Sequence, residues 1–270
     1  MQQYNHVYLA PHYDDISLSC GGSIHRQTQA GETVLGVTMC AASPTSETFS
    51  AFAEFMHQSW GNPDEVVATR RAEDEASLKI LGADAQRLGL LDCIYRGDPA
   101  AGIWYYNNDV ELFGQIHPDD LPLASEIAAG LVELIPAKDG PTIYAPLTVG
   151  HHVDHQLAHL AAWQLHQQGY SILFYEDYPY ADPNYPFTYH VGENRYNLAA
   201  ALAAPRPGKL TPQLRPISEE NLEAKIKSIR AYASQLDILF GGEAAMAKYV
   251  RQYALYVGEG GLAERVWLPA

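Results

Sequence analysis

Short apolar runs alternate with longer segments of helical periodicity over the first two thirds of the chain. The apolar runs predict strands at 7–10, 33–39, 88–91, 142–145 and 172–175. The segments between them predict helices at 17–30, 68–81, 123–134 and 153–168. Because strands that alternate with helices usually form a parallel sheet covered on both faces, we expect an α/β fold: a Rossmann-like three-layer sandwich with a mostly parallel central sheet.

The pattern changes after Asp177. Residues 178–186 and 205–216 are rich in proline and predict loops. Helical periodicity returns over 219–239 and 243–256, and a strand-like segment follows at 265–268. No repeat, low-complexity tract or linker divides the chain. We therefore expect a single domain over residues 1–270, with a core over about residues 5–180 and a C-terminal helical and strand embellishment over about residues 181–270.

Composition and charge narrow the class of protein. The 270 residues are 47% hydrophobic, so the chain is long and apolar enough to bury a substantial core. With 17 basic and 32 acidic residues, the net charge is −15. This charge argues against nucleic-acid and anionic membrane partners, because both attract cations. The longest apolar stretch, 198–204, is far shorter than the roughly 20 residues that span a bilayer.

Two further features bear on the cellular location. The first residues lack the basic and then apolar pattern of a signal peptide. The three cysteines, Cys20, Cys40 and Cys93, are widely spaced and odd in number, which is typical of reduced thiols. We expect a cytoplasmic protein with no membrane partner, and the sequence leaves its oligomeric state open.

Two clusters of polar side chains follow predicted strands. The first strand leads into residues 12–15, His-Tyr-Asp-Asp, and the strand at 142–145 leads into residues 150–155, Gly-His-His-Val-Asp-His. Ligands of open α/β sheets bind at the carboxyl ends of the strands. Imidazole and carboxylate are ligands of Zn²⁺, and either cluster alone could instead be an ordinary loop or a helix N-cap. The two clusters together predict a metal site.

These clusters resemble the two motifs of the PIG-L/LmbE-like family of zinc-dependent N-deacetylases. The family motifs are close to His-Pro-Asp-Asp-Glu and His-Pro-Asp-His, and here residues 12–16 read His-Tyr-Asp-Asp-Ile and residues 152–155 read His-Val-Asp-His. The pair Gly21-Gly22 and the segment 70–73, Arg-Arg-Ala-Glu, are also similar to family features. The resemblance covers about residues 5–180. More weakly, residues 232–235 and 263–267 look like tail segments of some members.

The resemblance implies a role for each motif residue. It implies that His12, Asp15 and His155 bind Zn²⁺, although such a two-histidine, one-carboxylate site also accepts other divalent transition metals. It implies that Asp14 is the general base that deprotonates the attacking water. His152 is implied as an acid or as a donor to the oxyanion, oriented by Asp154.

Arg70 has two interpretations. It could contact a substrate hydroxyl or phosphate, or it could form a surface ion pair with Glu73 or Asp74.

The activity implied by the resemblance is zinc-dependent removal of an acetyl group from an N-acetylated amino sugar or its conjugate, a small-molecule substrate. Two alternatives remain open. One is a Rossmann-like module that binds a sugar or nucleotide without turnover, although no Gly-x-Gly-x-x-Gly follows the first strand. The other is a metal-binding homologue made inactive by departures from the motifs, such as Ile16. We expect the segment after Asp177 to shape the mouth of the pocket.

Several other signals are interpreted as structural. Residues 117–120, His-Pro-Asp-Asp, match the first motif more literally, but no convincing strand precedes them and no glycine pair follows, so we expect a solvated turn. His159 lies one helical turn after His155 and could compete as a ligand, but we expect a partly buried helix histidine. Cys20 is expected to be a buried thiol. The aromatic segments 104–106 and 175–185 could wall a sugar site or pack within loops.

Overall fold

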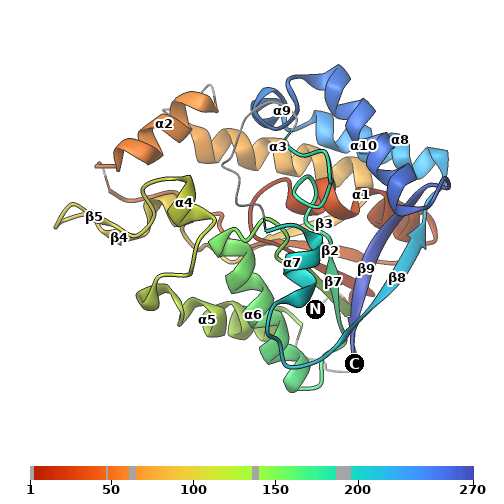
Figure 1. The fold of residues 1–270 in the computed structure, drawn as a ribbon, viewed down its shortest axis with the longest axis horizontal. Helices are drawn as coiled ribbons and strands as arrows, with labels where there is room; N and C mark the ends of the chain where they lie inside the picture. The colour runs from red at the N-terminus through yellow and green to blue at the C-terminus, as the bar shows by residue number, and fades with distance from the viewer. Residues whose placement is uncertain (1–2, 47, 61–64, 136–139, 187–195) are drawn as a thin grey trace.

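A seven-stranded sheet forms the centre of the molecule (Figure 1). The computed structural model describes residues 3–46, 48–60, 65–135, 140–186 and 196–270. In the order in which they pair, the strands are β3 (Asp84–Arg87), β2 (Val34–Thr38), β1 (His6–Ala10), β6 (Thr142–Pro146), β7 (Ile172–Tyr175), β9 (Ala263–Pro269) and β8 (Leu210–Pro216). The first five pair in parallel, and β9 and β8 add an antiparallel edge. This confirms the expected mostly parallel sheet.

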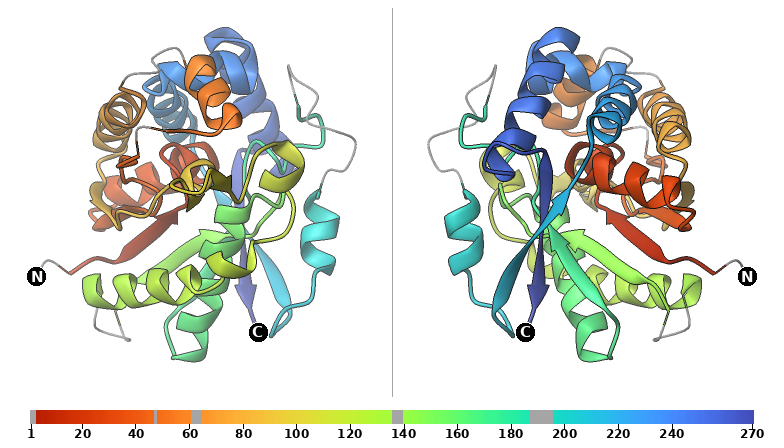
Figure 2. Two further views of the ribbon diagram at one scale, coloured as in Figure 1. Left: turned by 90° about the vertical axis from the view of Figure 1, so that its left-hand side faces the viewer. Right: turned by 90° about the vertical axis from the view of Figure 1, so that its right-hand side faces the viewer.

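Helices cover both faces of this sheet (Figure 2). On one face lie α1 (Asp15–Gln29), α3 (Val66–Leu81) and α8 (Glu219–Arg230), and on the other lie α5 (Leu123–Leu134) and α6 (Val153–Gln167). The remaining helices are α2 (Ala51–Ser59), α4 (Asp109–Leu112), α7 (Leu198–Ala203), α9 (Ala233–Phe240), α10 (Glu243–Val257) and the 3₁₀ turns η1 (Cys93–Tyr95) and η2 (Pro118–Asp120). A small hairpin joins β4 (Gly97–Asp98) and β5 (Ile103–Trp104). Within the described ranges, no helix is long and apolar enough to cross a bilayer.

The strand β1 shows why the central strands are apolar throughout. Val7 and Leu9 belong to the hydrophobic cluster that contains α5 and α6 residues, whereas Tyr8 and Ala10 belong to the cluster that contains α1 and α3 residues. Because successive strand residues point to opposite faces and both faces are covered, every position of this strand after His6 is buried. The three-layer arrangement therefore follows from the pattern that predicted it.

Three predicted elements differ from the structure. The strand expected at 88–91 lies four residues earlier, at 84–87, because β3 is a half-exposed edge strand and carries no apolar run. The loop expected at 205–216 contains β8, an outer strand whose prolines need no partner for a backbone N–H on the open side. The helix expected over 219–239 is broken before α9, since Tyr232 leaves helical geometry and its hydroxyl donates to Asp74 Oδ1 at 2.9 Å.

The C-terminal segment, expected as an embellishment, completes the central sheet. Its attachment explains the glycine pair of α1. Lys225 of α8 and Glu264 of β9 form a buried ion pair, with Nζ and Oε1 2.7 Å apart, and the Gly22 backbone N–H donates to Glu264 Oε1. A Cβ atom on Gly21 would lie 2.9 Å from Lys225 Cγ, so only glycine allows this approach.

A second attachment positions α9. Glu73, the acidic residue of the Arg-Arg-Ala-Glu segment, accepts hydrogen bonds from the backbone N–H and the hydroxyl of Ser234, at 2.8 and 2.7 Å. The segment at 70–73 and the tail segment at 232–235 are therefore in direct contact. This contact holds α9 beside α3 (Figure 1), and Gln235 and Leu239 of α9 line the same cavity as His12, which follows β1.

Candidate metal centre and active site

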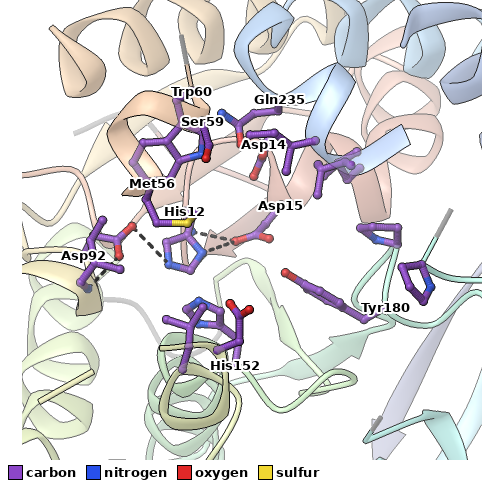
Figure 3. A pocket seen from close by; sticks show the side chains of 18 of the residues that line it. His12, Asp14, Asp15, Met56, Ser59, Trp60, Asp92, His152, Tyr180 and Gln235 are labelled. Carbon is purple, nitrogen blue, oxygen red and sulfur yellow. Dashed lines mark hydrogen bonds and ion pairs between the residues drawn. The ribbon is translucent and has the colours of Figure 1, made fainter. Parts of the chain in front are cut away.

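The structure brings the two polar clusters together. Residues 12–15 form the turn between β1 and α1, and residues 152–155 begin α6 after β6. Because β1 and β6 are parallel neighbours, their carboxyl ends meet at one edge of the sheet (Figure 3). The six predicted site residues in these clusters are buried, and none of them is more than 9% exposed.

Asp15 lies between two imidazoles. Its Oδ2 is 3.4 Å from His12 Nδ1, and its Oδ1 is 3.4 Å from His155 Nε2. The far nitrogen of each ring is held by another carboxylate: His12 Nε2 is 2.9 Å from Asp154 Oδ2, and His155 Nδ1 is 2.6 Å from Asp177 Oδ1. Histidines that bind metals usually donate their other ring N–H to such a group. The two nitrogens that face Asp15 are therefore oriented as ligands.

The charge distribution at this point favours a cation. Burial lowers the pKa of His155, but Asp15 and then Asp177 more than offset this and raise it to about 9. Burial likewise lowers the pKa of His12, but Asp92, Asp15 and Asp154 raise it well above its usual range. The carboxylates that favour a proton on these rings would equally favour a divalent cation between them.

His152 differs from its neighbours. It is the N-cap residue of α6, and its Nδ1 accepts the backbone N–H of Asp154 at 3.2 Å, so the ring proton of the neutral form is on Nε2. Burial, together with nearby His12, holds the pKa of His152 well below its usual range. A neutral imidazole with its N–H at Nε2 can donate a hydrogen bond but offers no lone pair there.

Asp14 has a strained backbone that aims its side chain into the cavity. Its φ is 95°, a region that non-glycine residues rarely adopt, and its side chain makes no cap to α1. Asp14 Oδ2 lies 3.5 Å from Arg70 Nη2. Burial raises the pKa of Asp14, Arg70 opposes the shift and Asp15 adds to it, and the resulting value is about 7. This carboxylate can therefore exchange a proton near neutral pH.

Arg70 is not the surface ion-pair partner of Glu73 or Asp74, and that interpretation is wrong. Arg70 is buried, faces Asp14, donates from Nη2 to the Tyr13 carbonyl at 3.0 Å, and lies 5.0 Å above the Trp60 ring. Its side chain lines the cavity.

The carboxylate of Asp154 contacts His12 and not His152, which it was expected to orient. Only the backbone N–H of Asp154 reaches His152. Arg96, which sequence reasoning missed, forms an ion pair with Asp154 Oδ1 at 2.6 Å and with Asp120 Oδ2 at 2.8 Å. Asp120 is buried, so the expectation of a solvated turn at 117–120 is wrong for this residue, although it holds for exposed Asp119.

No local pattern could have identified the missed residues. Arg96 and Asp92 belong to an irregular segment next to η1, and Asp177 follows β7 without a motif. Each reaches the site only because the topology brings separate loops to one edge of the sheet. Asp92 Oδ2 lies 3.7 Å from His12 Nε2. A dashed line marks this contact in Figure 3.

Arg96→Met is expected to weaken binding of the predicted metal ion, tested with Zn²⁺, by about 10- to 100-fold, the usual cost of losing an outer partner of a metal ligand. The reason is that Asp154, which holds His12 Nε2, would lose its buried countercharge. Competition with a chromophoric chelator measures the affinity. Arg96→Lys keeps the charge and should retain more of the affinity. Unchanged affinity in a folded Arg96→Met protein would contradict this role.

Three groups of side chains among the described residues have ligand atoms close enough to share one ion. They are His12 with His152 and His155, His12 with Cys40 and Asp154, and Cys93 with His152 and Asp154. Burial raises the pKa of the Cys40 and Cys93 thiols well above the usual range, which disfavours their thiolate form in the metal-free protein. The chemistry of the donors therefore favours the imidazoles and carboxylates.

A cavity of about 470 Å³ opens beside this cluster. Tyr180 lines it, and its hydroxyl points into the cavity (Figure 3). Gly150 allows this, since its φ is 90° and a Cβ atom there would lie 2.6 Å from Tyr180 Cγ. Tyr185 also lines the cavity, whereas Tyr106 is buried elsewhere and donates to Asp120. The aromatic segment at 175–185 therefore contributes to the wall.

The remaining sequence signals are structural. Ile16, which departs from the first motif, is buried in the core between α1 and the sheet rather than in the cavity wall. His159 Nδ1 bonds to the Pro146 carbonyl, and its Nε2 accepts the indole N–H of Trp163 at 2.9 Å. Burial lowers the pKa of His159 to about 4. Cys20 is a buried thiol, as expected.

Comparison with known proteins gives a consistent result. Residues 7–166 match the family model for PIG-L, GlcNAc-PI de-N-acetylase. The chain is 27% identical over 187 residues to 2′-N-acetylparomamine deacetylase of Niallia circulans, covering 64% of this chain and 66% of that protein. It is 31% identical over 185 residues to the same-named protein of Streptomyces fradiae, covering 65% and 57%. These alignments thus span less than two thirds of either relative's length.

A solved structure resembles nearly the whole chain. It is the zinc-inhibited form of teicoplanin deacetylase Orf2, with a TM-score of 0.78, 26% identity, and coverage of 97% of this chain and 96% of that one. This coverage is wider than residues 7–166, which match the family model, and it includes most of the C-terminal segment.

Proposed function

Because this chain belongs to the PIG-L family, we propose that it is a metal-dependent hydrolase that removes the N-acetyl group from an acetylated amino sugar or its conjugate. The relatives named above are deacetylases, of 2′-N-acetylparomamine in two cases and of teicoplanin in the third, as their names state. The observation that carries the proposal is the position of Asp15, 3.4 Å from a ring nitrogen of both His12 and His155, with Asp14 beside it.

The proposed metal ligands are His12, Asp15 and His155, and the proposed ion is Zn²⁺, although other divalent metals suit the same donors. His152 is left out of this set because its Nε2 carries the proton of the neutral ring. When bound, the ion supplies a Lewis acid that polarises the amide carbonyl and makes water acidic enough to react near neutral pH.

In the proposed reaction, Asp14 accepts the proton of the water that attacks the acetyl carbonyl and then passes it to the leaving amine. His152 donates from Nε2 to the carbonyl oxygen as negative charge develops there. Asp154 fixes the orientation of His12 through its carboxylate and that of His152 through its backbone N–H. Arg70 is proposed to hold Asp14 in place and to contact the polar part of the substrate.

Metal content and acetate release test this function together. Protein purified without chelator or a metal-affinity tag is expected to contain near-stoichiometric zinc by plasma mass spectrometry. It should release acetate from N-acetylglucosamine glycosides or 2′-N-acetylparomamine, lose this activity on chelation and regain it with added zinc. Protein that stays metal-free after zinc is added back would overturn the proposal and favour a module that binds without turnover.

A further inference from the structure

The cavity has a polar floor and apolar walls. Its floor contains the candidate metal centre together with Asp14 and Arg70. Its walls include Phe55, Met56 and Trp60 from α2 and its C-terminal end, Phe113, Tyr180, and Leu239 of α9. In Figure 3, Met56 of α2 and Gln235 of α9 lie on the same side of His12 and Asp15, and Tyr180 lies on the opposite side. Apolar side chains from four separate segments thus converge above the polar cluster.

These walls do not suit a purely polar ligand. The sugar of the proposed substrate needs hydrogen-bond partners for its hydroxyls, and aliphatic side chains such as Met56 and Leu239 offer none. A cavity of about 470 Å³ also falls within the size range that holds a drug-sized ligand, which is larger than one acetamido sugar. A bulky group beyond the sugar is therefore needed to fill it.

Phe55 adds a further observation. It lies on α2 at the cavity wall and is 57% exposed, an uncommon position for so large an apolar side chain. Covering it would remove apolar surface from water, which stabilises a complex in proportion to the area buried. Only a ligand with apolar surface can therefore gain this binding free energy from the walls.

We propose that the substrate carries a bulky apolar group in addition to its acylated amino sugar, and that these walls bind that group. This inference rests on the proposed function of the same site. The apolar group could be the aglycone of a glycoside or an acyl chain longer than acetyl, because both present the same chemistry to the walls. A polycationic sugar, which could use the rim carboxylates of Asp109 and Asp237, is the competing outcome.

Three substrates distinguish these cases: methyl N-acetylglucosaminide, octyl N-acetylglucosaminide and methyl N-octanoylglucosaminide, each used as monomers in solution. One of the two octyl compounds is expected to exceed the methyl N-acetyl compound in kcat/KM by about 100-fold. Preference for the octyl glycoside identifies the aglycone, and preference for the octanoyl amide identifies the acyl chain. Equal values for all three, or faster turnover of 2′-N-acetylparomamine than of either octyl compound, would overturn the inference.

Two variants connect the preference to the wall. Phe55→Ser is expected to reduce the octyl preference by about tenfold. Tyr256→Ser is the matched control, since Tyr256 is also an aromatic helix residue, is 59% exposed and does not line the cavity. It should leave the preference unchanged. If Phe55→Ser kept the full octyl preference, α2 would not contribute to binding of the apolar group, and the proposed role of Phe55 would be wrong.

Binding of the deacetylated products separates this inference from the proposed function. Where the aglycone is the apolar group, octyl glucosaminide is expected to bind at least about tenfold more tightly than methyl glucosaminide by titration calorimetry, whether or not the protein turns over substrate. Tighter octyl binding without acetate release would support the apolar wall and refute the deacetylase. Acetate release with equal binding of the two products, and with no preference for the octanoyl amide, would support the deacetylase and refute the apolar wall.

Discussion

Asp14→Asn is expected to lower kcat by about 10³-fold, within the range attributed to general acid–base catalysis, while the metal content stays unchanged. Asparagine has nearly the same shape as aspartate and tolerates a positive φ, so it can occupy the strained position at 95°. Its amide cannot accept the proton of the attacking water. Steady-state kinetics together with plasma mass spectrometry of the same preparation would measure both quantities.

Asp119→Asn provides the matched control for this substitution. Asp119 belongs to the segment that matches the first family motif more literally, but its side chain is 70% exposed and lies outside the candidate metal centre. We expect wild-type kcat and wild-type metal content for this variant. If Asp14→Asn hydrolysed substrate as fast as the wild type, Asp14 would not be the base.

His155→Ala is expected to abolish stoichiometric zinc binding and, with it, activity. The substitution removes one proposed ligand and leaves the buried carboxylates of Asp15 and Asp177 without the imidazole between them. The loss of zinc affinity should exceed the factor of about 10–100 that follows removal of an outer partner. Metal analysis after equilibration with zinc measures the effect.

The next histidine along α6 tests whether this loss is specific. His159→Ala removes the bonds to the Pro146 carbonyl and the Trp163 indole, so it should lower the thermal unfolding midpoint but retain zinc. Full zinc content in His155→Ala would shift the ligand set toward His12, Asp15 and His152. Loss of zinc in both variants would indicate a general effect on folding.

The two proposed metal-ligand clusters could be found from the sequence because each is local. His12, Asp14 and Asp15 follow one apolar run, and His152 and His155 follow another. A parallel sheet brings such strand ends to the same edge, and the structure does bring them together. Their individual roles in catalysis and metal binding remain predictions that the experiments above test.

The surroundings of these clusters could not be found in the same way. Arg96 and Asp120 come from irregular segments, and nothing in the pattern near either residue shows that they meet Asp154 inside the protein. The same holds for the wall, which combines α2 and α9 with loop residues. The strands β3 and β8 were mispredicted for a similar reason. They are partly exposed edge strands without an apolar run, and they form by pairing with β2 and β9.

The sequence by itself determined the α/β class, the parallel direction of the central strands and the two polar clusters at their ends. These features depend on periodicity and on residues close together along the chain, which a linear pattern records. The tertiary structure alone decided which nitrogen of each histidine faces Asp15, which charges surround it, and which side chains form the cavity walls. Those properties depend on contacts between distant segments and on burial, because removal of water determines how strongly charged groups act on one another.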